Sequence, residues 1–178
     1  MYLDGAETKR LYIRKLDISD IAIWETFFKN NSSLEYLGLD LSLDAKTQSK
    51  DWIERQLWRY GNRAYGHHAL ILKDTINFIG QCGLLTQEIE GNKEIEIGYH
   101  ILPEYWGLGF ATEAAHFFRN YAFDNDLCHS LVSIIDIRNV TSQKVAEKIG
   151  MQRGKQVRYH DQDVYIYRIY KGDYLCMG

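Results

Sequence analysis

The chain has 178 residues, of which 46% are hydrophobic and 25% charged, and this profile predicts one compact folded domain over residues 1–178. A single proline and 14 glycines exclude a long flexible linker or a collagenous repeat. The formal net charge of -3 disfavours a protein that grips nucleic acid through lysine and arginine, so we expect no nucleic-acid partner.

The sequence also disfavours a membrane protein, a protein held together by disulfides and a metalloprotein. No apolar run reaches the roughly 18 residues needed to cross a bilayer, and the start, MYLDGAETKR, lacks the apolar core of a signal peptide. We therefore expect no membrane partner and a cytoplasmic location. The three cysteines include no CxxC pair, which predicts reduced thiols. The pair His67-His68 has no third ligand at metal spacing, so we expect no metal site.

Hydrophobic spacing and turn signals predict the elements in chain order. A strand over 11–15 precedes a helix that buries Ile21, Trp24 and Phe28, and a second helix spans 44–60. Strands follow over 68–72, 76–85 and 94–101, with turns at 73–75 and 91–92. Pro103 ends the last of these strands, and the run WGLGF opens a long helix with Leu108 at the start of its apolar face.

The remaining elements complete an α/β pattern. A strand over 131–137, a helix over 139–149 and a terminal hairpin of strands over 152–157 and 163–169 give the order βααβββαβαββ. Hairpins combined with strand–helix crossovers predict a mixed, mostly antiparallel sheet of about six to seven strands. About four helices are expected to cover both of its faces.

A glycine-bracketed turn, Trp106 to Thr112, lies where the third of these strands passes into the long helix. Such a turn points backbone N–H groups outward at the positive end of the helix dipole, so it binds a pyrophosphate without basic side chains. A turn that uses glycine only for its geometry would have the same sequence. The dinucleotide fingerprint GxGxxG does not fit, because Thr112 stands in place of the third glycine.

The chain resembles the GNAT acetyltransferase superfamily on two segments, EIEIGYHILPEYWGLGFATEAAHFFRNYAF (94–123) and NVTSQKVAEKIGM (139–151). Within it, the chain is similar to the branch of ribosomal-protein N-terminal (alanine/serine) acetyltransferases, and the order of elements corresponds to the GNAT fold. The resemblance implies that the pantetheine of acetyl-CoA lies between two splayed parallel strands, 94–101 and 131–137. It also implies that the pyrophosphate lies on the loop 106–112.

The family's loop signature is Gln or Arg, two variable residues, Gly, any residue, then Gly or Ala. Gly109 and Ala111 match it, whereas Trp106 replaces the Gln or Arg and leaves backbone amides as the main phosphate ligands. Trp106 is equally compatible with a packing role at the helix start. The resemblance implies the following acetyl-CoA-binding residues: Ile101, Leu102, Trp106, Gly107, Leu108, Gly109, Phe110, Ala111, Thr112, Asn139 and Ser142.

Glu96 is the candidate catalytic base, acting directly or through a water. It lies in the middle of the strand 94–101, two residues before Gly98, where the family's catalytic carboxylate often lies. Glu94 on the same face and His100 are its competitors, and the structural alternatives are a solvated strand carboxylate or an ion pair with Lys93. An N–H group of the segment 98–101, freed by a bulge at the glycine, is expected to stabilise the oxyanion.

Ser142 is the candidate proton donor to the leaving thiolate. Many members of the superfamily have a tyrosine in the last helix, but the corresponding residue here is Ala146, so the role cannot be transferred directly. Ser142 follows Asn139 in the NxxS pattern of the branch. The alternative is a capping role for both residues, with Asn139 as N-cap and Ser142 three residues later.

The expected function is transfer of an acetyl group from acetyl-CoA to a primary amine, foremost the N-terminal α-amine of a protein or peptide. An α-amine with a pKa of about 8 costs about 1.4 kcal/mol to deprotonate at pH 7, against about 4.6 kcal/mol for a lysine. Small amines such as polyamines or aminoglycosides, and a non-catalytic acyl-CoA-binding module, remain alternatives. In the loop between the first helices, Glu35, Asp40 and Asp44 are either amine-attracting groups or solvated acids. We expect a monomer or homodimer.

Overall fold

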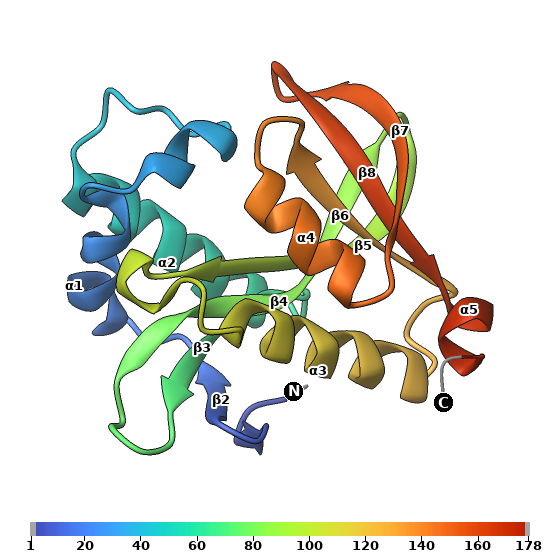
Figure 1. Cartoon of the computed structure of the whole chain (residues 1–178). Helices are drawn as coiled ribbons and strands as arrows, with labels where there is room; N and C mark the ends of the chain where they lie inside the picture. The colour runs from blue at the N-terminus through green and yellow to red at the C-terminus, as the bar shows by residue number, and fades with distance from the viewer. Residues whose placement is uncertain (1–2, 177–178) are drawn as a thin grey trace.

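The computed structural model describes residues 3–176 and consists of one mixed sheet with helices on both faces (Figure 1). The strands are β1 (Ala6–Glu7), β2 (Leu11–Lys15), β3 (His67–Leu72), β4 (Phe78–Ile89), β5 (Asn92–Ile101), β6 (Ser130–Asp136), β7 (Gln152–Tyr159) and β8 (Gln162–Tyr170). The α-helices are α1 (Asp20–Trp24), α2 (Ala45–Gly61), α3 (Phe110–Asp124), α4 (Val140–Lys148) and α5 (Lys171–Leu175). Short 3₁₀ helices are η1 (Glu25–Phe28), η2 (Ser32–Tyr36) and η3 (Pro103–Tyr105).

The sheet order is β1-β2-β3-β4-β5-β6-β8-β7, and every neighbouring pair except β5–β6 is antiparallel. The predicted α/β class and element order are confirmed. The described residues contain eight strands rather than six or seven and five α-helices rather than four. The additions are the short elements β1 and α5, which are too brief for hydrophobic periodicity to reveal.

Two hydrophobic clusters hold the helices to the sheet. One joins α3 and α4 to the strands through Phe118, Ala122 and Ala146 against Ile97 and Leu131. On the opposite face, α1, η1 and α2 pack against the other side of the strands. Members of that second cluster include Trp24, Phe27, Ile53, Tyr60, Ala69 and Phe78. The predicted coverage of both faces is therefore present.

Several turns differ from their predicted positions by one or two residues. Ile76 belongs to the β3–β4 turn rather than to a strand, with a φ of 58° and an exposed side chain. The β4–β5 turn is Glu90-Gly91, both at positive φ, and Asn92 already pairs with Ile89. This two-residue geometry is typical of tight hairpins, because its twist matches that of the strands.

Backbone irregularity lies in β4 rather than in β5. The β3–β4 register shifts between Leu70 and Ile71, beside Gly80. In contrast, the β4–β5 register runs without interruption from Ile89–Asn92 to Gly80–Ile101, so the bulge expected at Gly98 is absent. Position 98 requires a glycine for a different reason, because a Cβ there would lie 2.6 Å from Nε2 of His67.

None of the helices among residues 3–176 combines the length and apolarity that a membrane crossing requires. Over the same residues, no three His, Cys, Asp or Glu side chains come together in a way that would hold a metal ion.

Candidate active site

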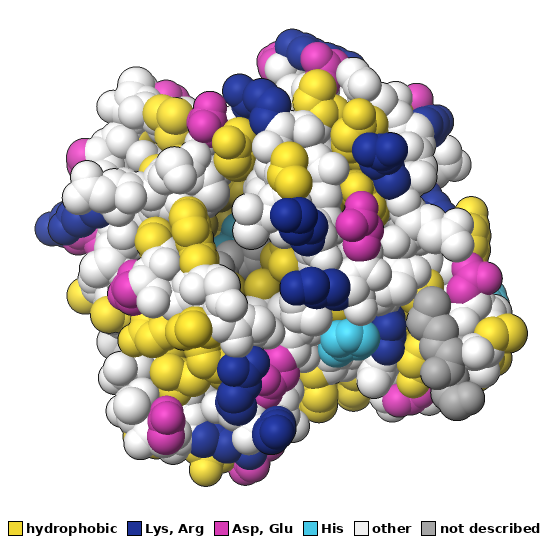
Figure 2. Space-filling model, in the orientation of Figure 1, with side chains coloured by type: hydrophobic (Ala, Val, Ile, Leu, Met, Phe, Trp, Pro, Cys, Tyr) yellow, Lys and Arg dark blue, Asp and Glu magenta, His cyan; other side chains and the backbone are white. Residues whose placement is uncertain are grey.

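A cleft with a volume of about 540 Å³ opens between the lobe that carries η2 and the lobe that carries α4. Figure 2 shows the hollow between these lobes, with Lys and Arg side chains gathered on its α4 rim. Two of the residues that line the cleft on that side are Lys144 and Lys148. The cleft wall is completed by β5, β6 and the loop before α3, so the predicted strand pair and loop lie together.

Divergence of two parallel strands creates the cleft. β5 and β6 pair only at Glu96 and Val132 and separate beyond that point. Where the strands part, the Ser133 hydroxyl donates to Ile97 O at 2.8 Å. Ile97 O thus faces β6, and since strand backbone groups alternate sides, the N–H of Tyr99 also faces the cleft. The splay, rather than a bulge, leaves this donor without a strand partner.

The start of α3 presents backbone donors to the cleft. Gly107 and Gly109 have φ values of 76° and 83°, which glycine adopts without strain. Glu113 N makes the first intrahelical hydrogen bond, to Gly109 O at 3.0 Å. The N–H groups of Phe110, Ala111 and Thr112 therefore lie ahead of the intrahelical ladder and are available to an anion.

Arg10 and Glu113 fix this loop, a contact that the sequence reasoning missed. Arg10 Nε lies 2.6 Å from Glu113 Oε2, its Nη1 donates to Leu108 O at 2.9 Å, and its guanidinium lies 4.2 Å from the centroid of the Phe110 ring. Thr8 also donates to Glu113 at 2.6 Å. Burial raises the pKa of Glu113, but these hydrogen bonds outweigh it and lower the pKa. The connection between β1 and β2 thus holds the loop in place from outside the cleft.

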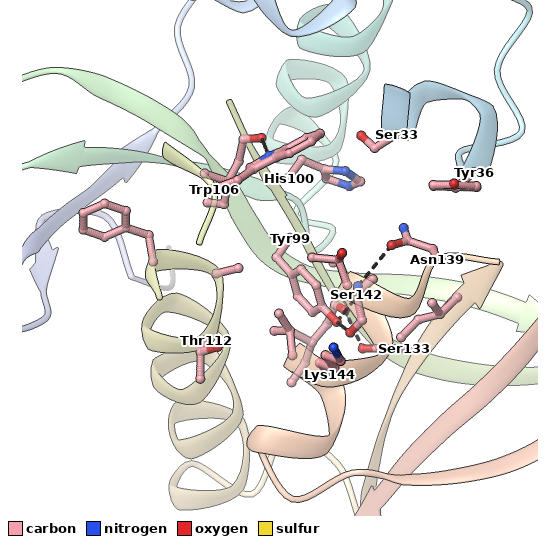
Figure 3. A pocket seen from close by; sticks show the side chains of 18 of the residues that line it. Ser33, Tyr36, Tyr99, His100, Trp106, Thr112, Ser133, Asn139, Ser142 and Lys144 are labelled. Carbon is pink, nitrogen blue, oxygen red and sulfur yellow. Dashed lines mark hydrogen bonds between the residues drawn. The ribbon is translucent and has the colours of Figure 1, made fainter. Parts of the chain in front are cut away.

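Trp106 joins the loop to the end of β5. Its indole Nε1 donates to Ile101 O at 2.7 Å, while 41% of the residue stays exposed at the cleft (Figure 3). Both interpretations of Trp106 therefore have support, since the ring is an anchor and also lines the wall.

Most of the predicted cofactor residues come together, and two do not. Ile101, Trp106, Gly107, Gly109, Phe110, Ala111, Thr112, Asn139 and Ser142 all line the cleft. Leu102 is buried in the α2-side cluster, and Leu108 exposes its side chain to solvent while Arg10 binds its carbonyl. The structure therefore places the side chains of Leu102 and Leu108 outside the cleft.

Asn139 and Ser142 form the expected cap, and a third residue joins them. Asn139 Oδ1 accepts from Ser142 N at 3.0 Å. Tyr99 crosses from β5 to donate its hydroxyl to Ser142 O at 2.8 Å, and Ser142 Oγ donates to the Tyr99 hydroxyl oxygen at 3.1 Å (Figure 3). Ala146 is fully buried. A tyrosine hydroxyl thus lies beside Ser142, but it comes from β5, and alternation along the strand was the only sequence signal for it.

Glu96 lies on the cleft wall and is only 9% exposed. Gln87 Nε2 donates to its Oε2 at 2.6 Å, and Ile134 N approaches its Oε1 at 3.4 Å. Burial raises the pKa of Glu96, and the bonds from Gln87 and Ile134 oppose that rise. A carboxyl with a raised pKa is a better proton acceptor than an ordinary one. Neither structural alternative is found, because the carboxylate is buried rather than solvated and forms no ion pair with Lys93.

The two competitors of Glu96 are less suited to act as base. Glu94 is bound by both Nη atoms of Arg168, at 3.0 and 2.6 Å. His100 lines the cleft, but burial lowers its pKa to about 4, so it holds a proton poorly at neutral pH. Its ring packs edge-on against Trp52, Phe27 and His67.

The three loop acids have structural partners. Glu35 Oε2 lies 3.4 Å from Nη1 of Arg138, Asp40 accepts from Ser42, and Asp44 caps α2 through Thr47 N at 2.9 Å. None of the three lines the cleft.

Comparison with known proteins identifies the family. A family model described as an acetyltransferase (GNAT) domain matches residues 10–152. The uncharacterized protein YkkB of Bacillus subtilis is 32% identical over 164 residues, which cover 90% of this chain and 92% of the relative. The uncharacterized N-acetyltransferase p20 of Bacillus licheniformis is 26% identical, with 94% and 96% covered. The chain therefore belongs to the GNAT family of N-acetyltransferases, whose acetyl donor is acetyl-CoA.

Solved structures share the fold over nearly the whole chain. An acetyltransferase from Agrobacterium tumefaciens has a TM-score of 0.77 and 26% identity, covering 96% of each chain. RimL, a ribosomal L7/L12 α-N-protein acetyltransferase in complex with coenzyme A, has a TM-score of 0.75 and 14% identity, covering 93% and 97%. A spermidine N-acetyltransferase from Vibrio cholerae with CoA and spermine has a TM-score of 0.73 and 19% identity, covering 93% and 98%. The same fold is thus found in an acetyltransferase named for a protein acceptor and in one named for spermidine, so the fold does not identify the acceptor.

Proposed function

We propose that this chain, acting as one domain, transfers an acetyl group from acetyl-CoA to the N-terminal α-amine of a protein or peptide by direct attack in a ternary complex. The observation that carries the proposal is the cleft itself. It brings a phosphate-type loop, a pair of splayed strands and a buried carboxylate of raised pKa to one place.

The residues of the cleft fit acetyl-CoA. The N–H groups of Phe110, Ala111 and Thr112 would hold the pyrophosphate, with Lys144 and Lys148 supplying positive charge from the opposite rim. Polar groups of the splayed strands and of Asn139 would bind the pantetheine amides. Bound acetyl-CoA supplies the activated acetyl group. Gly107 adds no side chain, and nothing lies within 4 Å of where its Cβ would be, so the loop is open to a ligand.

The remaining cleft residues supply the chemistry of transfer. Glu96 accepts the proton that the attacking amine loses, directly or through a water. The N–H of Tyr99 faces the cleft where β5 leaves β6 and would stabilise the developing oxyanion. Ser142, whose Oγ lies 3.1 Å from the Tyr99 hydroxyl, would give its hydroxyl proton to the departing thiolate. Solvent would restore that proton, and Glu96 would release to solvent the proton that it took from the amine.

The charge around the cleft favours an acceptor with a single amine over a polyamine. Of the described residues that line the cleft, Glu96 and Asp136 are the carboxylates, and Asp136 is already bound by Nε and Nη2 of Arg138 at 2.9 and 2.8 Å. A polyamine carries several positive charges and needs several free carboxylates to replace its hydration. The acceptor wall instead consists of hydroxyl and apolar side chains, which suit a peptide: Phe27, Ser32, Ser33, Tyr36 and Leu37.

An acceptor panel tests the proposal. Coenzyme A release is followed with acetyl-CoA and peptides that have free N-termini, the same peptides with blocked N-termini, and spermidine. We expect turnover with the free α-amines and none with the blocked peptides, even where these contain lysine. Turnover of spermidine alone would place the chain in the small-amine class, and tight acetyl-CoA binding without turnover of any acceptor would make it a binding module.

A further inference from the structure

A chain of hydrogen bonds leads from the cleft to the terminal hairpin. Gln87 on β4 donates from Nε2 to Glu96 Oε2 at 2.6 Å, and the Tyr159 hydroxyl, near the end of β7, donates to Gln87 Oε1 at 3.2 Å. Gln87 stands opposite Glu94 in the β4–β5 register, so its side chain reaches Glu96 diagonally across the pair. Three strands therefore contribute to the surroundings of one carboxylate.

We propose that Gln87, oriented by Tyr159, is a positioning residue that holds the Glu96 carboxylate in its charged, proton-accepting state. This inference rests on the proposed function of Glu96 as base. An amide has one donor end and one acceptor end. Because Tyr159 donates to the oxygen of the amide, the NH₂ group faces Glu96 and stabilises the ionised form.

The surroundings of Glu96 show why such a partner is needed. On the same face of the sheet, β4, β6 and β8 contribute Ile89, Val132, Val164 and Ile166 to an apolar cluster against which Tyr159 packs. Burial of this kind raises the pKa of a carboxyl and would protonate it without compensation. The hydrogen bond from Gln87 opposes this rise in pKa more strongly than the bond from the Ile134 amide does.

The other charged groups around Glu96 change its pKa less, or their own charge is neutralised by a partner. Arg59 on α2 favours the ionised form through its charge. Glu94, two residues away on β5, is paired with Arg168 of β8, and Tyr99 on β5 and Tyr159 on β7 have hydroxyls whose pKa values are raised. Both tyrosines therefore stay neutral when Glu96 titrates.

The test measures the titration of Glu96 directly. In protein labelled with ¹³C at glutamate side chains, NMR follows the Glu96 carboxyl, which is assigned by its absence in Glu96→Gln. Gln87→Met keeps the length of the side chain and removes the amide. We expect the midpoint to rise by about one pH unit in Gln87→Met, a tenfold gain in proton affinity, and to rise less in Tyr159→Phe. Gln156→Met, at an exposed β7 position, is the matched control and should titrate as wild type.

An unchanged or lowered midpoint in Gln87→Met would overturn the inference, and Tyr159→Phe gives an independent reading if Gln87→Met does not fold. In kinetics, the acid limb of kcat/KM should move to higher pH with its plateau kept, whereas a merely structural role would lower the rate equally at every pH. If no acceptor is acetylated, the proposed function fails, yet the NMR titration still decides whether Gln87 controls Glu96.

Discussion

Ser142 and Tyr99 form a hydrogen-bonded pair at the cleft. In the described structure, each hydroxyl is hydrogen-bonded to the other residue, and Tyr99 anchors itself on Ser142 O. Burial raises the pKa of the Tyr99 hydroxyl, so at neutral pH it is a donor rather than an anion. A thiolate formed beside this pair would therefore meet a protonated partner.

For this pair, we expect Ser142→Ala to lower kcat about 100-fold while the affinity for acetyl-CoA stays within about twofold, because only proton return is lost. Tyr99→Phe should have a smaller effect, since Ser142 keeps its own proton. Thr141→Ala, on the same helix and also at the cleft, is the control. Equal kcat values for Ser142→Ala and wild type at saturating acceptor would remove Ser142 from the mechanism.

The start of α3 depends on a backbone conformation that glycine adopts more readily than any other residue. Gly109 is the N-cap of α3 at a φ of 83°, in the left-handed region, and a Cβ there would lie 3.5 Å from Nη2 of Arg10. An alanine at such a φ costs about 1 kcal/mol and pushes the backbone out of place.

Gly109→Ala should therefore lose both stability and acetyl-CoA affinity. Gly91→Ala is a matched control, because Gly91 has a φ of 78° in the β4–β5 turn, away from the cleft. Both variants should unfold at a similarly reduced denaturant concentration, but only Gly109→Ala should weaken acetyl-CoA binding, by about tenfold in calorimetry. The loop assignment would be wrong if both variants bound acetyl-CoA like wild type.

Long periodic elements could be predicted from the sequence, whereas contacts between elements could not. The helix over 44–60 is found as α2 with Asp44 as its cap, and the strand over 94–101 is found within β5. The Arg10–Glu113 pair and the Gln87–Glu96 bond join residues from different elements, so no local spacing reveals them. Tyr99 was placed on its strand, but its meeting with Ser142 depends on how far β5 and β6 diverge.

The site residues were predictable where a local motif exists. The glycines of the loop and the NxxS pattern predicted two stretches of the cleft wall, at 106–112 and at 139–142, but not the residues that β6 and η2 contribute. Leu102 and Leu108 belong to the same segment but point elsewhere, because sequence proximity does not fix the direction of a side chain.

On the α2 side of the sheet, near the cleft, the protein holds one buried histidine, His67, and one half-buried histidine, His100. Burial places the pKa of His67 well below its ordinary value and lowers that of His100 to about 4. Neither ring nitrogen of His67 has a hydrogen-bond partner among the described residues. Because the unfolded chain binds protons at these histidines at higher pH than the folded chain does, stability is lost as pH falls from about 6.5 toward 4.

His100→Phe should make stability less dependent on pH. A phenyl ring keeps the packing against Trp52 and Phe27 but does not titrate. Between pH 7 and pH 5 we expect wild type to lose about 2 kcal/mol through His100 that the variant keeps. Chemical denaturation of both proteins at the two pH values measures this, and the difference between them cancels the opposite contribution of Glu96. Parallel losses in the two proteins would show that His100 is not neutral in the folded state.

In the proposed function, this chain acetylates an α-amine with Glu96 as the proton acceptor. The most direct measurement is the kcat of coenzyme A release at pH 7, with saturating acetyl-CoA and a saturating peptide whose N-terminus is free, for wild type and Glu96→Gln. We predict turnover by wild type and a kcat about 100-fold lower in the variant. A Glu96→Gln kcat within twofold of wild type would contradict the account.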